Sequence, residues 1–375
     1  MSWESNRDHQ SLSRRLLDAF RLDPVLVFLL LLLSAAGMLI LYSASGGDLD
    51  RVLRQGMRLG LAWLLMLVMA NLPLRLLKKL SLGFYLGVVG LLLAVMLFGE
   101  IGKGAQRWLD LGFIRFQPSE LMKLAMPMML ASYLSDKVLP VDWRDLLASV
   151  VLVLVPVLLI AKQPDLGTAL LVGSAGFFVL FLAGVRWKIF FVLGLLASLM
   201  APLLWKFALH DYQRGRILTL LDPESDPLGA GYHIIQSKIA IGSGGIYGKG
   251  WLNGTQSQLD FLPERSTDFI FSVFGEEFGL FGAVLLLLLY ILIIFRGLWI
   301  AACSSDTYGR LLAGALSLTF FVYLFVNTGM VTGLLPVVGV PLPLVSYGGT
   351  SMVTLMLGFG MIMAVRSAKR FLGSP

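Results

Sequence analysis

Stretches without a charged residue recur along the chain and set its pattern. They cover residues 24–47, 59–74, 80–99, 146–161, 166–185, 189–205, 278–295 and 311–365. A helix that crosses the hydrocarbon core of a bilayer takes roughly 17–25 residues, and each stretch is close to that length or exceeds it. The last stretch is long enough for two helices, because proline and glycine break its centre at 334–346. With a weaker stretch at 118–134, which contains Glu120 and Lys123, the pattern predicts ten membrane-spanning helices.

The amino-acid composition also indicates a membrane protein. Apolar residues make up 57% of the 375 residues and charged residues 14%, whereas a soluble domain carries roughly 45–50% and 25%. The single cysteine, Cys303, excludes an internal disulfide. We therefore expect an all-α integral membrane protein, with a ten-helix membrane domain over residues 24–365, an N-terminal segment at 1–23 and a C-terminal tail at 366–375.

The distribution of lysine and arginine favours an orientation with both termini in the cytoplasm. Ten spans return the chain to its starting side, and the loops on that side hold roughly twice as many cations as the short outer loops. The long loop at 207–266, between spans seven and eight, is left out of this comparison because long loops are exempt from the rule. The first apolar run is longer than a signal-peptide core, so we expect it to be retained.

Six cations nevertheless lie in the two short loops expected on the outer side. They are Arg51, Arg54, Arg58, Lys103, Arg107 and Arg115. They are either solvated loop charges or an electropositive mouth for an anionic substrate. The net charge of +7 indicates that the protein binds anionic lipids or an anionic substrate rather than nucleic acid, since no soluble basic domain is expected.

Motifs for nucleotide and metal binding do not fit this sequence. The glycine-rich stretch at 242–250 departs from a phosphate-binding Walker motif at Ser243 and at Gly250. The three histidines, at positions 9, 210 and 233, are scattered along the chain. We expect neither ATP binding nor a histidine metal cluster.

Several charged side chains lie at membrane level, where charge is costly and marks functional sites. Glu120 and Lys123 are three residues apart, so they share a helix face and form either a self-neutralising pair or part of a site. Asp165 follows a proline at the start of a span, which is also an ordinary helix start. Asp268 precedes the eighth span, where it or Thr267 could simply cap the helix.

The predicted topology brings these acids together. Spans four, six and eight all start at the outer surface, so Glu120, Asp165 and Asp268 are expected at one depth on one side of the membrane. Glu276 follows Asp268 on the same helix face, roughly 12 Å deeper at 1.5 Å per residue. A polar stripe is therefore expected to run inward from the outer mouth, as suits a catalytic site or a transport path.

Five motifs stand in order along the chain, most of them around these charged residues. They are 104–108 (GAQRW), 117–120 (QPSE), 163–168 (QPDLGT), 256–271 (QSQLDFLPERSTDFIF) and 343–349 (PLVSYGG). Together they resemble the SEDS family, named for shape, elongation, division and sporulation, over essentially the whole chain after residue 20. Two blocks, 222–233 and 256–265, favour the branch that serves cell elongation over the branch that serves division. Ser266 departs from the family, which commonly has His there.

The resemblance implies a peptidoglycan glycosyltransferase that polymerises lipid II, for cell elongation and rod shape, at the outer face of the bacterial cytoplasmic membrane. It implies a class B penicillin-binding protein as transpeptidase partner, beside other membrane proteins of the elongation machinery. Asp268 is implied as the catalytic residue. The candidates for binding or supporting the substrate are Glu120, Lys123, Asp165, Arg107, Arg115, Gln117 and Glu276.

The chemistry of this reaction suits the residues. Lipid II carries its sugar α-linked to a pyrophosphate and the glycan is β-1,4-linked, so one displacement with one base inverts the linkage. Asp268 is the expected base. The leaving pyrophosphate needs cations, for which Arg107, Arg115 and Lys123 are candidates. Mg²⁺ or Mn²⁺ held by carboxylates is the one candidate cofactor.

Two other functions compete with the transferase. In a lipid II flippase, Glu276 and the Glu120–Lys123 pair would line a translocation path. Such a path needs matched polar features on both faces, whereas the predicted inner loops are short. In a non-catalytic scaffold of the elongation machinery, clustered acids at membrane level would have no use. The sequence therefore favours the transferase.

Overall fold

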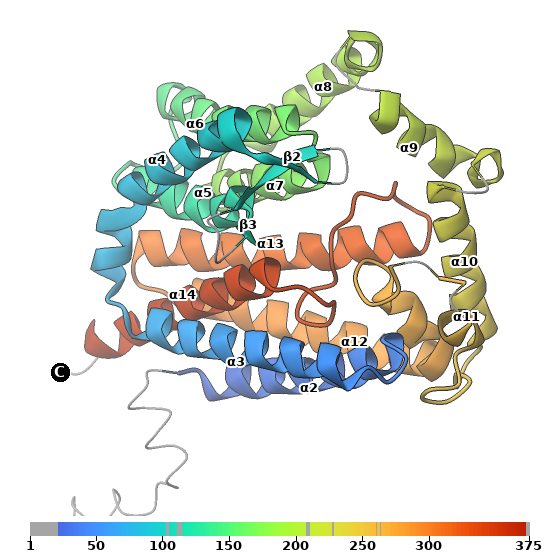
Figure 1. The fold of residues 1–375 in the computed structure, drawn as a ribbon. Helices are drawn as coiled ribbons and strands as arrows, with labels where there is room; N and C mark the ends of the chain where they lie inside the picture. The colour runs from blue at the N-terminus through green and yellow to red at the C-terminus, as the bar shows by residue number, and fades with distance from the viewer. Residues whose placement is uncertain are drawn as a thin grey trace, which may run out of the picture.

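The structure is a computed structural model that describes residues 22–102, 105–110, 115–207, 211–226, 229–259, 261–262 and 264–372. Ten long helices make up most of these residues (Figure 1). They are α2 (Pro24–Ala44), α3 (Leu49–Asn71), α4 (Leu74–Phe98), α5 (Pro118–Ser135), α6 (Trp143–Lys162), α7 (Leu166–Leu182), α8 (Trp187–Phe207), α12 (Ile270–Ala302), α13 (Thr307–Val331) and α14 (Thr350–Leu372). Between α8 and α12 lie α9 (Asp211–Leu221), the 3-10 turn η1 (Pro223–Ser225), α10 (Ala230–Ser243) and α11 (Thr255–Gln258).

Each of the ten predicted stretches overlaps one of the ten long helices. Within the described residues, seven helices are long and apolar enough to cross a membrane, namely α2, α3, α4, α6, α12, α13 and α14. The expectation of a mostly helical protein with several apolar spans is confirmed. The count of ten crossings, the side of each terminus and the limits of the long loop stay predictions.

The two ends of the bundle differ in what they carry. The start of α2 and the end of α14 lie at one end, on the left in Figure 1, while α10 and α11 lie at the opposite end. α12 begins at that second end, beside α10. The segments around α10 and the start of α12 therefore lie at the end of the bundle opposite the start of α2 and the end of α14.

One predicted helix start, that of α3, is wrong by several residues. α3 begins at Leu49, capped by Asp48, which accepts a hydrogen bond from the Arg51 amide at 3.0 Å. Arg51, Arg54 and Arg58 therefore lie in the first turns of a helix rather than in a loop. α12 begins at Ile270, two residues after Asp268, as expected from the position of Asp268 ahead of the eighth span. Glu276 and Glu277, which precede the charge-free run at 278–295, are buried and bonded inside the protein.

The expectation of an all-α chain is wrong between residues 100 and 116. β1 (Glu100–Gly102), β2 (Ala105–Asp110) and β3 (Arg115–Phe116) form a small antiparallel sheet in the order β1-β2-β3. β1 and β3 are too short to carry an alternation of apolar and polar residues, and β2, with the sequence AQRWLD, does not alternate.

The glycine-rich stretch at 242–250 packs against a break in α12. Gly279 has a φ of 65°, which interrupts the helix. The freed backbone groups bond to the stretch instead: the Leu280 amide donates to Gly245 O at 2.9 Å, and the Lys249 amide donates to Glu276 O at 3.0 Å. Gly248 has a φ of 80°, and a Cβ there would collide with the Glu277 carbonyl. These glycines therefore allow two backbones to approach closely.

The segment between α13 and α14, residues 332–349, runs back among the helices. Its backbone is non-helical, as its prolines predict. The Tyr290 hydroxyl of α12 donates to Pro343 O at 2.5 Å, and Gly37 of α2 leaves room for Leu344 O. Irregular backbone at membrane depth is tolerated where protein covers it, and α2 and α12 provide that cover.

Replacing Gly248 tests the contact between the glycine-rich stretch and α12. We expect Gly248→Ala to lower the free energy of unfolding by about 1–3 kcal/mol, because a side chain there must adopt a left-handed conformation and meets the Glu277 carbonyl. Gly242→Ala is the matched control, since a Cβ at 242 meets nothing within 4 Å. Thermal melting of the purified chain in detergent measures both. Equal melting of the two variants would contradict the packing role.

Candidate functional site

Asp268 lies in a turn that precedes α12 and is hydrogen-bonded to the 332–349 segment. The Asn327 side-chain amide donates to Asp268 O at 2.9 Å. The Ser346 hydroxyl donates to Thr267 O at 2.5 Å, and the Tyr347 amide donates to Ser266 O at 2.8 Å. Three hydrogen bonds from two other parts of the chain therefore fix the backbone beside Asp268.

The Asp268 carboxylate faces a position that has no side chain. A Cβ at Gly339 would stand 3.5 Å from Asp268 Oδ2. Asp268 itself is partly exposed. Glu264 and Leu344, in the two segments that meet here, have φ values of 52° and 60°, which non-glycine residues rarely adopt. Such backbone strain persists only where surrounding contacts enforce it, and it gathers at functional sites.

Asp165 caps a helix, whereas Asp268 does not occupy a cap position. The N-cap residue of α12 is Phe269, which makes no side-chain cap hydrogen bond, so Asp268 stands one residue ahead of the cap position. Thr267 instead donates to Glu264. Asp165 is the N-cap of α7, and its Oδ1 accepts from the Thr168 amide at 3.2 Å. Capping is therefore a sufficient structural role for Asp165 but not for Asp268.

Asp165 also collects side chains from the segment that contains β2 and from the start of α5. Gln117 Nε2 donates to Asp165 Oδ2 at 2.7 Å. Arg107 Nη1 lies 3.9 Å from Asp165 Oδ1, and the same guanidinium donates to the carbonyls of Gln163 and Pro164. Gln117, Arg107 and Asp165, all predicted from their motifs, thus form one contact group at the start of α7.

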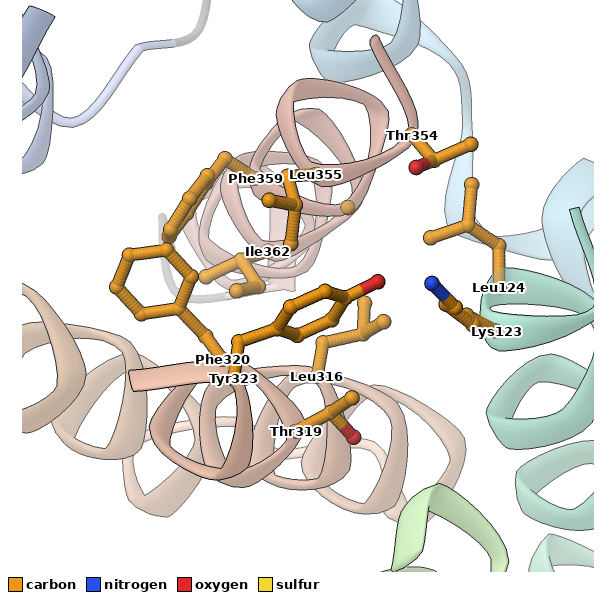
Figure 2. Close-up of a pocket in the computed structure, with 11 residues that line it drawn as sticks. Lys123, Leu124, Leu316, Thr319, Phe320, Tyr323, Thr354, Leu355, Phe359 and Ile362 are labelled. Carbon is orange, nitrogen blue, oxygen red and sulfur yellow. The ribbon is translucent and has the colours of Figure 1, made fainter. Parts of the chain in front are cut away.

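Glu120 and Lys123 form the predicted pair in α5. Lys123 Nζ lies 2.5 Å from Glu120 Oε1, and the Thr354 hydroxyl of α14 donates to Glu120 Oε2 at 3.3 Å. Lys123 Nζ is also 4.8 Å from the ring centre of Tyr323 in α13. Figure 2 shows Lys123, Tyr323 and Thr354 directed toward one another from three helices, around a cavity of about 30 Å³.

Residues 338–340 connect the Asp165 and Asp268 groups. A Cβ at Gly167, two residues after Asp165, would stand 3.0 Å from Val338 O, while Gly339 faces Asp268. Gln117 joins the Asp165 group to the first turn of α5, which carries Glu120. The three acids therefore lie along one connected region, although each carboxylate has its own set of neighbours.

Two cations of the expected outer mouth lie beside the Asp268 turn. The guanidinium carbons of Arg58 and Arg51 are 4.8 Å and 5.8 Å from the ring centre of Tyr347. Arg51 also donates to the Ser266 hydroxyl at 3.3 Å. Arg115 lies in β3, and its side chain is outside the described part of the structure.

Glu276 binds residues of the 249–258 loop and does not line an open polar stripe. Its carboxylate is fully buried and lies 2.7 Å from Lys249 Nζ. It also accepts from the Thr255 hydroxyl and the Gln256 amide, each at 3.0 Å. Ser272, which lies between Asp268 and Glu276 in the sequence, bonds to Ser237 of α10 at 2.7 Å. The expectation of a continuous polar stripe is wrong, because these groups are used to hold α10 and the 249–258 loop against α12.

Sequence reasoning missed several polar residues that hold the site. Asn327 is fully buried in α13 and bonds to Asp268 O and to Val340 O. Gln55 of α3 is also buried, and its side chain bonds to Ser346 O. For Asn327 the available signal was a lone amide inside the charge-free run at 311–365, since polar groups at membrane level are seldom without a use. Gln55 gave no such signal, because it lies between Arg54 and Arg58.

His233 of α10 packs beside the same turn. Its ring stacks on Phe269, with centroids 5.6 Å apart and planes at 18°. Burial lowers the pKa of His233 from its usual value, although Glu264 and Asp226 oppose the shift. The imidazole is therefore neutral near pH 7 and adds no cation to the Asp268 group.

The residues fit a divalent cation only if the substrate supplies most of its ligands. No three His, Cys, Asp or Glu side chains gather in a metal-binding arrangement in the described part of the chain. Mg²⁺ is often held by one or two carboxylates together with substrate phosphates. Asp268 could supply one such carboxylate.

This chain is similar to a known protein family over most of its length. The FtsW, RodA and SpoVE family model, described as "Cell cycle protein", matches residues 23–371. Peptidoglycan glycosyltransferase MrdB of Escherichia coli (strain K12) is 54% identical over 355 residues, covering 95% of this chain and 96% of the relative.

Solved structures resemble the whole bundle. One, described as "Structural coordination of polymerization and crosslinking by a peptidoglycan synthase complex", has a TM-score of 0.80 at 35% identity, covering 92% of this chain and 97% of that chain. The rod shape determining protein RodA of Thermus thermophilus has a TM-score of 0.69 at 32% identity, covering 92% and 96%.

A Glu276→Gln variant separates a loop anchor from a substrate ligand. We expect it to lower the free energy of unfolding by about 1–3 kcal/mol, because the buried hydrogen bonds to a charged group are weakened and Lys249 loses its ion pair. Glu224→Gln, at an exposed site in η1, is the control. Melting and limited proteolysis of the 249–258 loop are the measurements. Unchanged melting with lost activity would instead make Glu276 a substrate ligand.

Proposed function

The chain belongs to the SEDS family of FtsW, RodA and SpoVE proteins and is a peptidoglycan glycosyltransferase, and we propose that it polymerises lipid II by inverting transfer at the outer membrane face. The proposal rests most on Asp268, whose partly exposed carboxylate faces Gly339. Similarity to the rod shape determining protein RodA of Thermus thermophilus supports a role in rod shape and cell elongation.

Asp268 acts as the general base in this proposal. The 4-hydroxyl oxygen of the acceptor sugar attacks C1 of the donor sugar, and its proton passes to the Asp268 carboxylate. The bond from C1 to the pyrophosphate oxygen breaks, which turns the α-linkage into a β-1,4-linkage. The base must be ionised and within hydrogen-bonding reach. Partial exposure supports the first condition, and the fixed backbone around Asp268 supports the second.

Cations around the turn receive the leaving pyrophosphate. Arg51 and Arg58 lie over Tyr347 beside the Asp268 turn, and Arg107 lies beside Asp165. Donors fixed before the reaction stabilise charge that develops on a leaving group. Arg115 stays a candidate from its motif. Lys123 is occupied by Glu120, so we assign this pair to supporting the site.

An apolar groove offers a place for the lipid tail of the substrate. It has a volume of about 640 Å³ and is lined by Val157, Leu166, Leu170, Phe177 and Val338. Val338 belongs to the segment that also faces Asp268 through Gly339. A polyprenyl chain lying along α6 and α7 would therefore bring its pyrophosphate toward the acids.

The membrane arrangement and the partners complete the proposal. Ten spans would place both termini in the cytoplasm and residues 207–266 outside. The similar solved structure concerns a complex that coordinates polymerisation with crosslinking. This supports a class B penicillin-binding protein as transpeptidase partner, with other elongation-complex membrane proteins. Mg²⁺ or Mn²⁺, when bound, would neutralise pyrophosphate charge beside Asp268.

An Asp268→Asn variant tests the general base. We expect polymerisation of labelled lipid II to fall roughly 10²–10⁴-fold, the usual contribution of general base catalysis. Asn keeps the size of the side chain but cannot take the proton. The reaction is measured with the partner present and its transpeptidase blocked by a β-lactam.

Asp50→Asn, an exposed acid at the start of α3, is the matched control and should polymerise like wild type. Melting of both variants should stay near that of the parent chain. Polymerisation by Asp268→Asn within about threefold of wild type, far below the general-base range, would move the base to Asp165 or Glu120.

A further inference from the structure

One face of α3 lies against the segment at 332–349. Arg51, Gln55 and Arg58 follow one another at spacings of four and three residues, so their side chains share that face. Both guanidinium groups lie over the ring of Tyr347, and the Gln55 side chain donates to the backbone of the segment. The first turns of α3 therefore help to hold the segment that bonds to the turn before α12.

Arg51 also reaches this turn directly. Its Nη1 donates to the hydroxyl of Ser266 at 3.3 Å, two residues before Asp268. Ser266 is buried, so water does not readily replace this donor. Arg58 contacts Tyr347 more closely than Arg51 does, but among the described residues it makes no hydrogen bond to the turn. The two arginines of the face thus differ in what they bind.

Asp48 directs the Arg51 side chain toward the turn. As the N-cap of α3, it accepts from the Arg51 amide at 3.0 Å, and its second oxygen lies 3.8 Å from Arg51 Nε. The exposed ion pair alone contributes little to stability. Together with the cap, however, it holds both the backbone and the guanidinium of Arg51 beside Ser266. This serine stands where the family commonly has His, and its short hydroxyl meets a donor that α3 brings to it.

We propose that Arg51 is a positioning residue that acts on Asp268 through Ser266. The inference rests on the proposed function of Asp268 as the general base. The Arg51–Ser266 bond ties the turn to α3, beside the bonds from Asn327 and from the 332–349 segment. A base must stay within hydrogen-bonding reach of the proton that it takes. Because a displacement of about 1 Å can cost roughly 10²-fold in rate, this third tie contributes to the rate of transfer.

A direct contact between Arg51 and the substrate is the competing explanation. In that case the losses caused by Arg51→Gln and Ser266→Ala are independent and multiply. If Arg51 acts through Ser266, the serine hydroxyl matters only while the guanidinium is present. A double-mutant cycle therefore distinguishes the two explanations. Arg58→Gln provides the matched cycle, because Arg58 contacts Tyr347 without bonding to the turn.

Polymerisation of labelled lipid II measures both cycles, with the full-length chain, its partner present and the transpeptidase blocked by a β-lactam. We expect Ser266→Ala to lower kcat about tenfold in the wild-type chain, as for a lost hydrogen bond to a charged group. In the Arg51→Gln chain, the same change should lower kcat less than about threefold, whereas in Arg58→Gln it should again cost about tenfold. KM should stay within about threefold of wild type, because Ser266 is buried.

Hydrogen exchange of the amides at 264–269 tests the same contact without lipid II. Arg51→Gln and Ser266→Ala should each speed exchange in this turn, and the double variant should speed it no further. Arg54→Gln, at an exposed position on the same helix, is the control and should exchange like wild type. Melting curves show that each variant is folded.

Two outcomes would overturn the proposal. Equal losses of kcat from Ser266→Ala in the wild-type and Arg51→Gln chains would make Arg51 a substrate ligand that acts independently of the turn. Unchanged exchange at 264–269 in Arg51→Gln would show that Arg51 does not hold the turn. A wild-type chain that polymerises no lipid II, with the expected exchange in the variants, would instead contradict the proposed function and support the contact.

Discussion

One buried amide donates a hydrogen bond to each of the two segments on which the site depends. Asn327 Nδ2 donates to Asp268 O at 2.9 Å and to Val340 O at 2.8 Å. Backbone that is neither helix nor sheet at membrane depth must find its hydrogen bonds inside the protein. Asn327 supplies two of them, one where α12 begins and one where the 332–349 segment passes. The placement of the Asp268 carboxylate opposite Gly339 follows from this bridge.

The four acids discussed for the site differ in burial and in their position relative to helix starts. Asp165 caps α7 and gathers Gln117 and Arg107. Glu276 is fully buried among donors from the 249–258 loop, and Glu120 is paired with Lys123. Asp268 is the partly exposed member, one residue ahead of the cap of α12. General base catalysis needs an acid that the acceptor sugar can reach and that is ionised before the reaction.

The sequence predicts the helices well and the partners of the acids poorly. Charge-free runs reveal where helices lie, but the start of α3 was missed because its first turns carry charged residues such as Arg51, which finds a partner within the protein. Asn327 and Gln55 went unnoticed because their partners lie in distant parts of the chain. The motifs identified Asp268 and Asp165, whereas their different surroundings became visible only in three dimensions.

The most direct test of Asp268 as the base is a structure of the chain and its partner with two unreactive lipid II analogues bound. The acceptor's 4-hydroxyl oxygen should lie about 2.6–3.2 Å from an Asp268 carboxylate oxygen, or be bridged to it by one water. The donor pyrophosphate should lie toward Arg51, Arg58 or Arg107. An acceptor hydroxyl that instead bonds Asp165 or Glu120, with Asp268 out of reach, would contradict the assignment.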